Sequence, residues 1–447
     1  MRFPVRFPYG FQTRIPGGAW KEKATAAVLV MFTMAFLLPA PVSAADKLLQ
    51  SSDVTYVGSF RVPHGSYGPS SFESGGGQAA YYPAHNSLFL TGPINTFYVA
   101  EISIPAPKTG SLSGMNTATV LQNFSDPTEG RSGNIMAGGG CCVANGVKPG
   151  GLLVYNNKLI GTSFSYYDPE PYYAVRSHYT SGLTLSANDG AGMFEMSGLP
   201  LTREGTHGAS FASGWMAEIP SAYQSALGAT HITGNGSLNI IGRTSWGPSA
   251  FAANLGQLGS TVPLLATPLF YYTEAHPSIG QWNGGSGTYQ TVWNGTGIIR
   301  GMAWPSGSRS ILYIGLVGTG PFCYGTGDEC GDPASPNKGN HAYPYIYWVW
   351  AYDANDLVAA KNGTKRPWQV VPYATWELVS PFGFTVYADM GAGGVAYDPG
   401  TKRLFVAQPQ ADGSFPVVNV YSVNVESTPP PPPQLVPSPP TGLTISQ

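Results

Sequence analysis

A glycine-led pattern recurs along the chain and constrains its fold more than any other feature. Each copy starts with glycine, continues into a short apolar segment of small residues, turns, and runs into a second apolar segment. Two apolar runs joined by such a turn predict a β-hairpin. The clearest copies are 77–90, 150–161, 301–314 and 393–407, and a less regular copy begins near His207.

Repeated hairpins of this kind predict an all-β chain folded as a β-propeller, in which four-stranded sheets surround a central channel. Small residues suit the first strand of each repeat because the blades crowd together at the channel. Residues 301–317, followed by the aromatic segment 345–352 and by 368–378, would make one complete blade. The expected blades begin near residues 77, 150, 208, 301 and 393.

The last repeat contains three evident strands, and we expect its fourth from residues 54–62, which alternate as a strand should. This exchange would close the ring and remove exposed sheet edges. Two alternatives stay open. The long third repeat contains residues 239–253, which would form a sixth blade, and 221–227, which suggest one helical turn. A β-sandwich would also contain hairpins of this type.

The two ends of the chain differ from the repeats in composition. Residues 1–23 are basic, an apolar run follows at 24–38, and small residues surround Ala44. These features predict a signal peptide over residues 1–44, because the apolar run is short for a membrane span. At the other end, residues 428–440 are rich in proline and predict an extended, semi-rigid linker.

The propeller domain is therefore expected to span residues 45–427. The final residues, 441–447, resemble the first strand of a fibronectin type III module, which implies the truncated start of such a module. Charged residues make up 10% of the chain and the formal net charge is −2. This balance argues against nucleic acid as a partner. We expect a monomeric, extracellular protein of bacterial type, without membrane attachment after the signal peptide is removed.

The four cysteines form two close pairs in the sequence. Export favours their oxidation, because disulfides persist outside the cytoplasm. We favour a bond between Cys323 and Cys330, which closes a small glycine-rich loop, and a vicinal bond between Cys141 and Cys142. Two bridges between the pairs remain the alternative.

The loop between Cys323 and Cys330 also concentrates acidic residues. Asp328 and Asp332 carry oxygen ligands of the kind that calcium prefers. Their spacing differs from that of an EF-hand loop, so solvated acids are the better interpretation. No other cofactor is expected.

Polar residues precede the first strand of each repeat, where a propeller places the mouth of its channel. The candidates are Glu73, Lys148, His207, Arg300 and Asp389, with Glu204 close to His207. A binding pocket needs a few convergent polar groups among apolar surroundings. Each candidate would also suit a structural role, either by satisfying loop backbone or by forming an ion pair.

Glycoside hydrolysis is the first functional hypothesis, because it needs two carboxyl groups across the sugar bond. Glu73 and Asp389 precede blades that become neighbours when the ring closes, and Glu204 lies roughly opposite. The five-bladed arrangement resembles the glycoside hydrolases of the arabinanase and levansucrase type, at the level of the fold. Those enzymes carry acids at the first three blades; here Glu73 and Glu204 match the first and third, and Lys148 occupies the second.

Two further hypotheses share a polysaccharide or a cell-surface glycan as the partner. A lyase removes a proton beside a uronate carboxyl that cations neutralise, and His207, Arg300 and Lys148 suit these roles. Residues 176–179, which include Tyr179, form a second cluster of suitable types. A non-catalytic glycan-binding or adhesion propeller would instead stack sugars on aromatic rings. The tryptophans near glycine-rich sequence are Trp215, Trp246, Trp282 and Trp293.

Overall fold

The computed structural model describes residues 47–136, 146–168, 174–200, 208–236, 244–280, 292–385 and 393–426. The predicted signal peptide, the proline-rich linker and the fibronectin-like residues lie outside these ranges. The described residues belong to one compact unit, Ser43–Gln447. Within the described ranges, no helix is long and apolar enough to cross a membrane.

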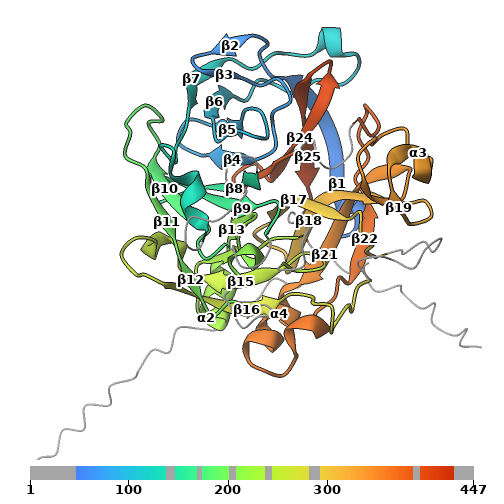
Figure 1. The fold of residues 1–447 in the computed structure, drawn as a ribbon. Helices are drawn as coiled ribbons and strands as arrows, with labels where there is room; N and C mark the ends of the chain where they lie inside the picture. The colour runs from blue at the N-terminus through green and yellow to red at the C-terminus, as the bar shows by residue number, and fades with distance from the viewer. Residues whose placement is uncertain are drawn as a thin grey trace, which may run out of the picture. The chain divides into compact units, whose positions relative to one another are not determined.

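Five sheets of four or five strands follow one another along the chain (Figure 1). Blade 1 comprises β4 (Ala79–Tyr82), β5 (Ser87–Thr91), β6 (Val99–Ser103) and β7 (Val120–Ser125). Blade 2 comprises β8 (Val147–Tyr155), β9 (Lys158–Ser165), β10 (His178–Gly182) and β11 (Ala191–Phe194). Blade 3 comprises β13 (Met216–Glu218), β14 (His231–Thr233), β15 (Ala250–Ala253) and β16 (Leu264–Phe270), with β12 (Met196–Ser197) at its outer edge.

Blade 4 comprises β17 (Ile298–Ala303), β18 (Ser310–Gly318), β21 (Tyr345–Asp353) and β22 (Ala374–Glu377). Blade 5 comprises β23 (Val395–Asp398), β24 (Arg403–Asp412), β25 (Phe415–Val423) and β1 (Val54–Arg61). The shorter elements include β2 (Ser66–Tyr67), β3 (Ser70–Ser71), β19 (Cys323–Gly325), β20 (Gly339–His341), α2 (Ser221–Leu227), α3 (Gly327–Cys330) and α4 (Ala354–Lys361).

The innermost strands form a closed ring. They contact one another in the order β4, β8, β13, β17, β23 and back to β4. In blade 5, the N-terminal strand β1 pairs antiparallel with β25, with Val54 opposite Val423 (Figure 1). The predicted five-bladed propeller and its closure by the N-terminal strand are therefore confirmed. The alternative of a β-sandwich is wrong.

Blade 3 begins later than the sequence predicted. The segment near residue 208 forms a buried 3-10 turn, Ala209–Phe211, and the innermost strand is β13. Residues 239–253 do not form a sixth blade, since their described end is β15, which pairs with both β14 and β16. The helical turn expected at 221–227 is present as α2.

Glycines allow the innermost strands to approach one another closely. A Cβ atom on Gly394 of blade 5 would lie 2.4 Å from the backbone nitrogen of Ala79 in blade 1. A Cβ atom on Gly151 of blade 2 would lie 2.3 Å from the carbonyl oxygen of Gly214, beside blade 3. Non-bonded carbon atoms prefer about 3.5–4.0 Å. The glycine-led repeat therefore reflects the crowding of backbones around the axis.

Replacing Gly394 by Ala is expected to destabilise the propeller by about 3 kcal/mol, near the upper end for overpacking, because the added methyl group meets backbone rather than a movable side chain. Gly339→Ala is the matched control, since a Cβ atom there meets nothing within 4 Å. Denaturant unfolding of both variants measures the difference. Equal free energies of unfolding would contradict the close approach at the axis.

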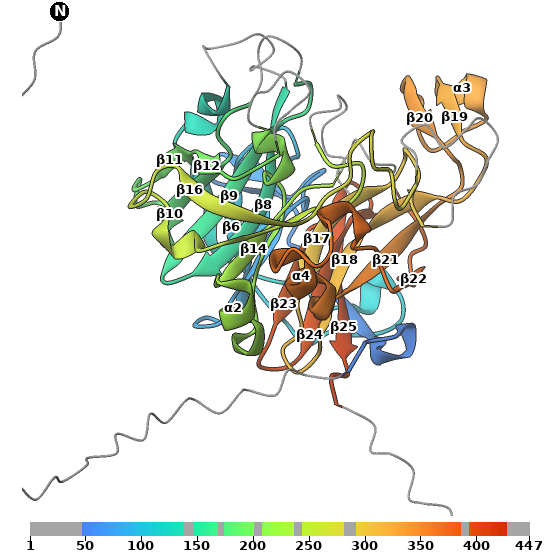
Figure 2. The same ribbon diagram turned by 90° about the horizontal axis from the view of Figure 1, so that it is seen from below.

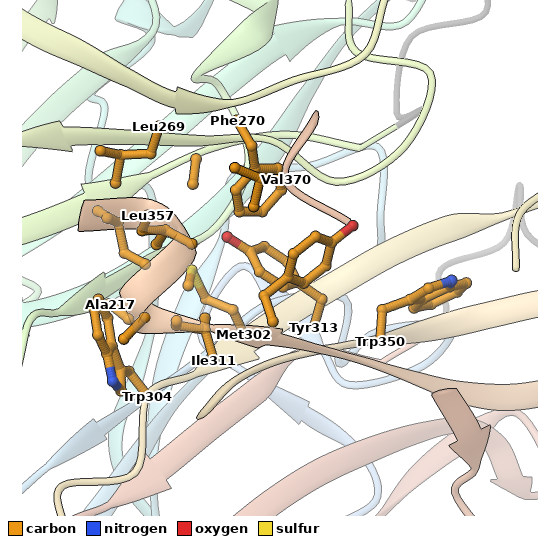
Figure 3. Close-up of a cluster of buried hydrophobic side chains, with 14 of the residues drawn as sticks. Ala217, Leu269, Phe270, Met302, Trp304, Ile311, Tyr313, Trp350, Leu357 and Val370 are labelled. Atoms are coloured by element: carbon orange, nitrogen blue, oxygen red, sulfur yellow. The ribbon is translucent and has the colours of Figure 1, made fainter. Parts of the chain in front are cut away.

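Aromatic residues fill the space between blades 3 and 4. Phe270 and Tyr352 are fully buried and stack with their ring centroids 4.3 Å apart. Figure 3 shows Phe270 and Tyr313 gathered beside Leu357 of α4, with Trp350 further along the same layer. This packing fixes blades 3 and 4 against each other, and with them the residues at the channel mouth.

Candidate functional site

The channel is lined by the innermost strands of all five blades. The lining residues are Gln78, Ala79, Gly151, Leu152, Trp215, Met216, Arg300, Gly301, Met302 and Val395. The cavity between these residues measures about 10 Å³. That is room for roughly one water. A larger ligand can therefore meet this part of the channel only at one of its ends. The end where the innermost strands begin is called the mouth.

Glu73 lies at this end, on the loop before β4, and is exposed to solvent. The loop is anchored to blade 5, because the backbone N–H of Ser74 donates to the carbonyl oxygen of Ser414 at 2.8 Å. Nearby, the N–H of Gly394 donates to the carbonyl oxygen of Gly76 at 2.8 Å. Glu73 is thus held where blades 5 and 1 meet, and the predicted neighbourhood of these two blades is confirmed.

The two predicted cations lie at the same end of their strands. Arg300 is on β17, is partly exposed, and lines the channel. Lys148 is on β8, with its Nζ atom 4.2 Å from the centre of the Tyr166 ring. A cation at this distance from an aromatic face is attracted by the ring quadrupole. Both cations thus stand near the start of an innermost strand, and their roles in binding a substrate stay predictions.

Gln78 is a channel residue that the sequence analysis did not select. Its side chain is buried, donates from Nε2 to the carbonyl oxygen of Pro149 at 2.9 Å, and accepts from the hydroxyl of Thr91 at 3.0 Å. The bond to Pro149 ties blade 1 to blade 2, and the bond from Thr91 fixes the amide within blade 1. The only available signal was an amide residue placed between Gly77 and Ala79 at the start of the first repeat.

Several predicted residues lie outside the described ranges. They are the candidate catalytic residues Glu204, His207 and Asp389, the cysteines Cys141 and Cys142, and Trp282. Their proposed roles stay predictions. In the sequence, Asp389 precedes the first residue of β23 by six positions.

The aromatic residues proposed for stacking on sugars are largely part of the core. Trp215 is 3% exposed and Trp293 is fully buried. Trp246 is partly buried and packs against the same hydrophobic cluster. The structural interpretation, in which aromatic rings fill the space between blades, therefore describes Trp215 and Trp293.

The cluster at residues 176–179 is also mostly internal. Tyr179 is 2% exposed, and burial raises the pKa of its hydroxyl well above the usual value. His178 is fully buried between the hydroxyls of Ser177 and Thr233, at 2.8 and 3.0 Å. Burial lowers the pKa of His178 to about 3, so its imidazole is neutral at pH 7. In this conformation neither Tyr179 nor His178 can meet a polymeric substrate.

The predicted disulfide between Cys323 and Cys330 is present, with the two Cα atoms 5.7 Å apart. It closes a loop containing β19 and α3, which together with β20 stand away from the strands of blade 4 in Figure 2. Asp328 lies exposed in the first turn of α3. The bond agrees with an oxidising compartment.

Asp332, the other predicted calcium ligand, is buried beneath this loop. One carboxylate oxygen accepts from His341 Nδ1 at 2.7 Å and from the Tyr345 hydroxyl at 2.6 Å, and the other accepts from the N–H of Ala334 at 2.8 Å. Although burial opposes ionisation, the hydrogen bonds from Tyr345 and His341 hold the pKa of Asp332 below its usual value. Among the described residues, no group of three or more His, Cys, Asp or Glu side chains is placed to hold a metal ion.

No protein-family model and no curated protein sequence matches this chain. Similar solved structures include a provisionally assigned glycoside hydrolase from Bacteroides ovatus, with 12% identity, 84% of this chain and 94% of that chain covered, and a TM-score of 0.38. A glycosyl hydrolase from Bacteroides ovatus has 13% identity, coverages of 85% and 93%, and a TM-score of 0.35.

A third similar structure comes from work on the GH130 family of mannoside phosphorylases, described as containing glycoside hydrolases that target β-1,2 mannosidic linkages in Candida mannan. It has 13% identity, coverages of 84% and 96%, and a TM-score of 0.35. At these TM-scores the likeness carries no argument about function. The five-bladed fold stands on the strand pairing and on the closed ring of innermost strands.

Proposed function

We propose that this protein is an exported carbohydrate-active propeller that cleaves a polysaccharide as a glycoside hydrolase. The observation that carries the proposal is the position of Glu73. The glycine-led strands converge on a channel that is too narrow for a ligand, and the exposed Glu73 is held at the mouth of this channel. The predicted signal peptide and the disulfide support an extracellular location.

The proposed chemistry uses two carboxyl groups on neighbouring blades. Glu73 precedes β4 and Asp389 precedes β23, and these two strands contact each other. In such hydrolases one group protonates the glycosidic oxygen while the other acts as base or nucleophile, at a separation of about 5–5.5 Å for retention or 6.5–9.5 Å for inversion. In this proposal, Glu204 and His207, which precede blade 3, contact the sugar from the opposite side of the mouth.

A polysaccharide lyase is the second candidate, and the positions of two cations favour it. Arg300 lines the channel and Lys148 begins the innermost strand of blade 2. Cations placed there would neutralise a uronate carboxyl and so acidify the neighbouring C–H bond. His207 would be the base in this alternative.

One assay separates these functions. The protein is incubated with neutral polysaccharides (arabinan, galactomannan, xylan) and with uronate polymers (polygalacturonate, alginate), while reducing ends and ultraviolet absorbance are both followed. Hydrolysis releases reducing ends without new absorbance. Products that absorb because of a new carbon–carbon double bond would replace the hydrolase by the lyase. Binding without any product would leave a non-catalytic propeller.

A further inference from the structure

A groove between blades 1 and 2 lies at the end of the propeller opposite to the channel mouth. Its lining residues are Tyr82, His85, Glu101, Leu121, Gln122, Leu183 and Thr184, and its volume is about 580 Å³. His85 belongs to the turn that joins β4 to β5, where the innermost strand ends. Ligand pockets in proteins commonly measure about 300–1,000 Å³. The groove is therefore large enough for a ligand and separate from the proposed catalytic site.

The base of the groove is a fully satisfied polar network around Glu101, which is completely buried. One carboxylate oxygen accepts from His85 Nδ1 at 2.7 Å and from the hydroxyl of Ser87, and the other accepts from Gln122 Nε2 at 2.6 Å. The Gln122 amide also donates to the carbonyl oxygen of Leu183 at 2.8 Å. A buried carboxylate is stable only when it is hydrogen-bonded in this way. Glu101 and Gln122 therefore position their neighbours and are not free to bind a ligand.

His85 is the side chain that this network presents to solvent. Because the Nδ1 atom of His85 is hydrogen-bonded to Glu101, the Nε2 atom is the ring nitrogen that can form a hydrogen bond with a ligand. The side chain is 53% exposed, and Nε2 has no hydrogen-bond partner within the described ranges. The Tyr82 ring lies 4.5 Å from the His85 ring. A hydrogen-bonding nitrogen, whose direction is fixed by the bond from Nδ1 to Glu101 and which lies beside an aromatic ring, thus faces the groove.

The walls of the groove are apolar. Leu121 on β7 is 48% exposed, and Leu183 and Tyr82 pack over the cluster of buried residues between the two blades. The exposed hydroxyl-bearing Thr184 stands beside Leu183. Such a surface matches a ligand with an apolar face and hydroxyl groups around its edge, which describes a pyranose ring.

Charge narrows the class of sugar. The Glu101 carboxylate lies beneath the groove, and none of the described residues that line it is Lys or Arg. An anionic ligand such as a uronate would face the Glu101 carboxylate, with no Lys or Arg among the lining residues to bind its charge. We propose that the groove is a second saccharide-binding site, specific for neutral sugar units, which holds a polysaccharide on the side away from the mouth. This inference follows from the chemistry of the groove and does not require the proposed hydrolysis.

Affinity electrophoresis in gels containing galactomannan, arabinan or xylan tests the site. The parent protein carries Glu73→Gln, so that the polymers persist during the run. We expect retardation by at least one neutral polymer, and Leu121→Asp should weaken that binding about tenfold or more, because it places an unpaired charge against the sugar. Leu265→Asp is the matched control, since Leu265 on β16 of blade 3 is 62% exposed and should leave the binding unchanged.

His85→Ala is a second, independent variant. Its free energy of unfolding is measured as well, to confirm that the fold tolerates the loss of one hydrogen-bond donor to Glu101. It too should reduce retardation about tenfold. Unchanged retardation in both variants, a parent protein that no neutral polymer retards, or equal retardation by polygalacturonate would each overturn the proposal. In a protein that keeps Glu73, cleavage of a short soluble oligosaccharide should be unaffected by Leu121→Asp, so failure of the groove and failure of the proposed hydrolase are separate results.

Discussion

Glu73→Gln is expected to abolish polysaccharide cleavage, lowering kcat by about 10²–10⁴-fold, the usual contribution of a general acid or base. The amide has nearly the same shape as the carboxyl group but cannot exchange the proton. Because Glu73 is exposed on a loop, the free energy of unfolding should not change. Asp389→Asn should have the same effect. Initial rates of reducing-end release, measured together with urea unfolding, provide the test.

The pH dependence of kcat/KM separates the two roles. Removing the general acid should remove the alkaline limb of the profile, and removing the base or nucleophile should remove the acidic limb. Asp328→Asn is the control, since Asp328 is an exposed acid on the disulfide-closed loop rather than at the start of an innermost strand. Full activity in both Glu73→Gln and Asp389→Asn would withdraw the hydrolase assignment while leaving the fold intact.

The ring architecture was predictable because its physical cause is local. Only glycine permits the backbone contacts found at Gly151 and Gly394, and each of these residues stands at the head of an apolar hairpin in the sequence. The predicted start of blade 3 was wrong because Gly208, like the glycines of the other repeats, precedes a segment of small and apolar residues. Gly214 holds the true position, where a Cβ atom would lie 2.6 Å from the carbonyl oxygen of Gly234. Glycine spacing alone does not separate these cases.

The groove could not be predicted, because it depends on strand register. Glu101 is a single acid in an otherwise apolar strand, which signals a buried partner but does not name it. The partners come from the β4–β5 turn, which carries His85, and from β7, which carries Gln122. They meet only because Phe89 is opposite Glu101 and Glu101 is opposite Gln122 in the sheet. Such pairings are long-range facts that a single sequence does not contain.

Acidification from pH 7 to pH 5 is expected to lower the free energy of unfolding by about 4 kcal/mol through two buried histidines. Burial lowers the pKa of His178 to about 3 and that of His231 to about 4. In the unfolded chain both return to about 6.5, so that the unfolded state binds protons first as the pH falls. The stabilisation is complete above about pH 6.5 and decreases towards the folded-state pKa values. At pH 5 each histidine contributes a loss of about 2 kcal/mol.

Urea unfolding at pH 7 and pH 5 measures this loss, and His178→Gln and His231→Gln should each reduce it by about half, because glutamine keeps a hydrogen-bonding group without a titrating proton. His64→Gln is the matched control. The His64 side chain is 43% exposed, so it lies outside the buried core that encloses His178 and His231. The same pH dependence in wild type and in both buried-site variants would show that His178 and His231 are protonated in the native state. Such a result would require the hydroxyls of Ser177, Thr230 and Thr233 to act as acceptors for imidazolium protons, in place of the neutral rings inferred from their burial.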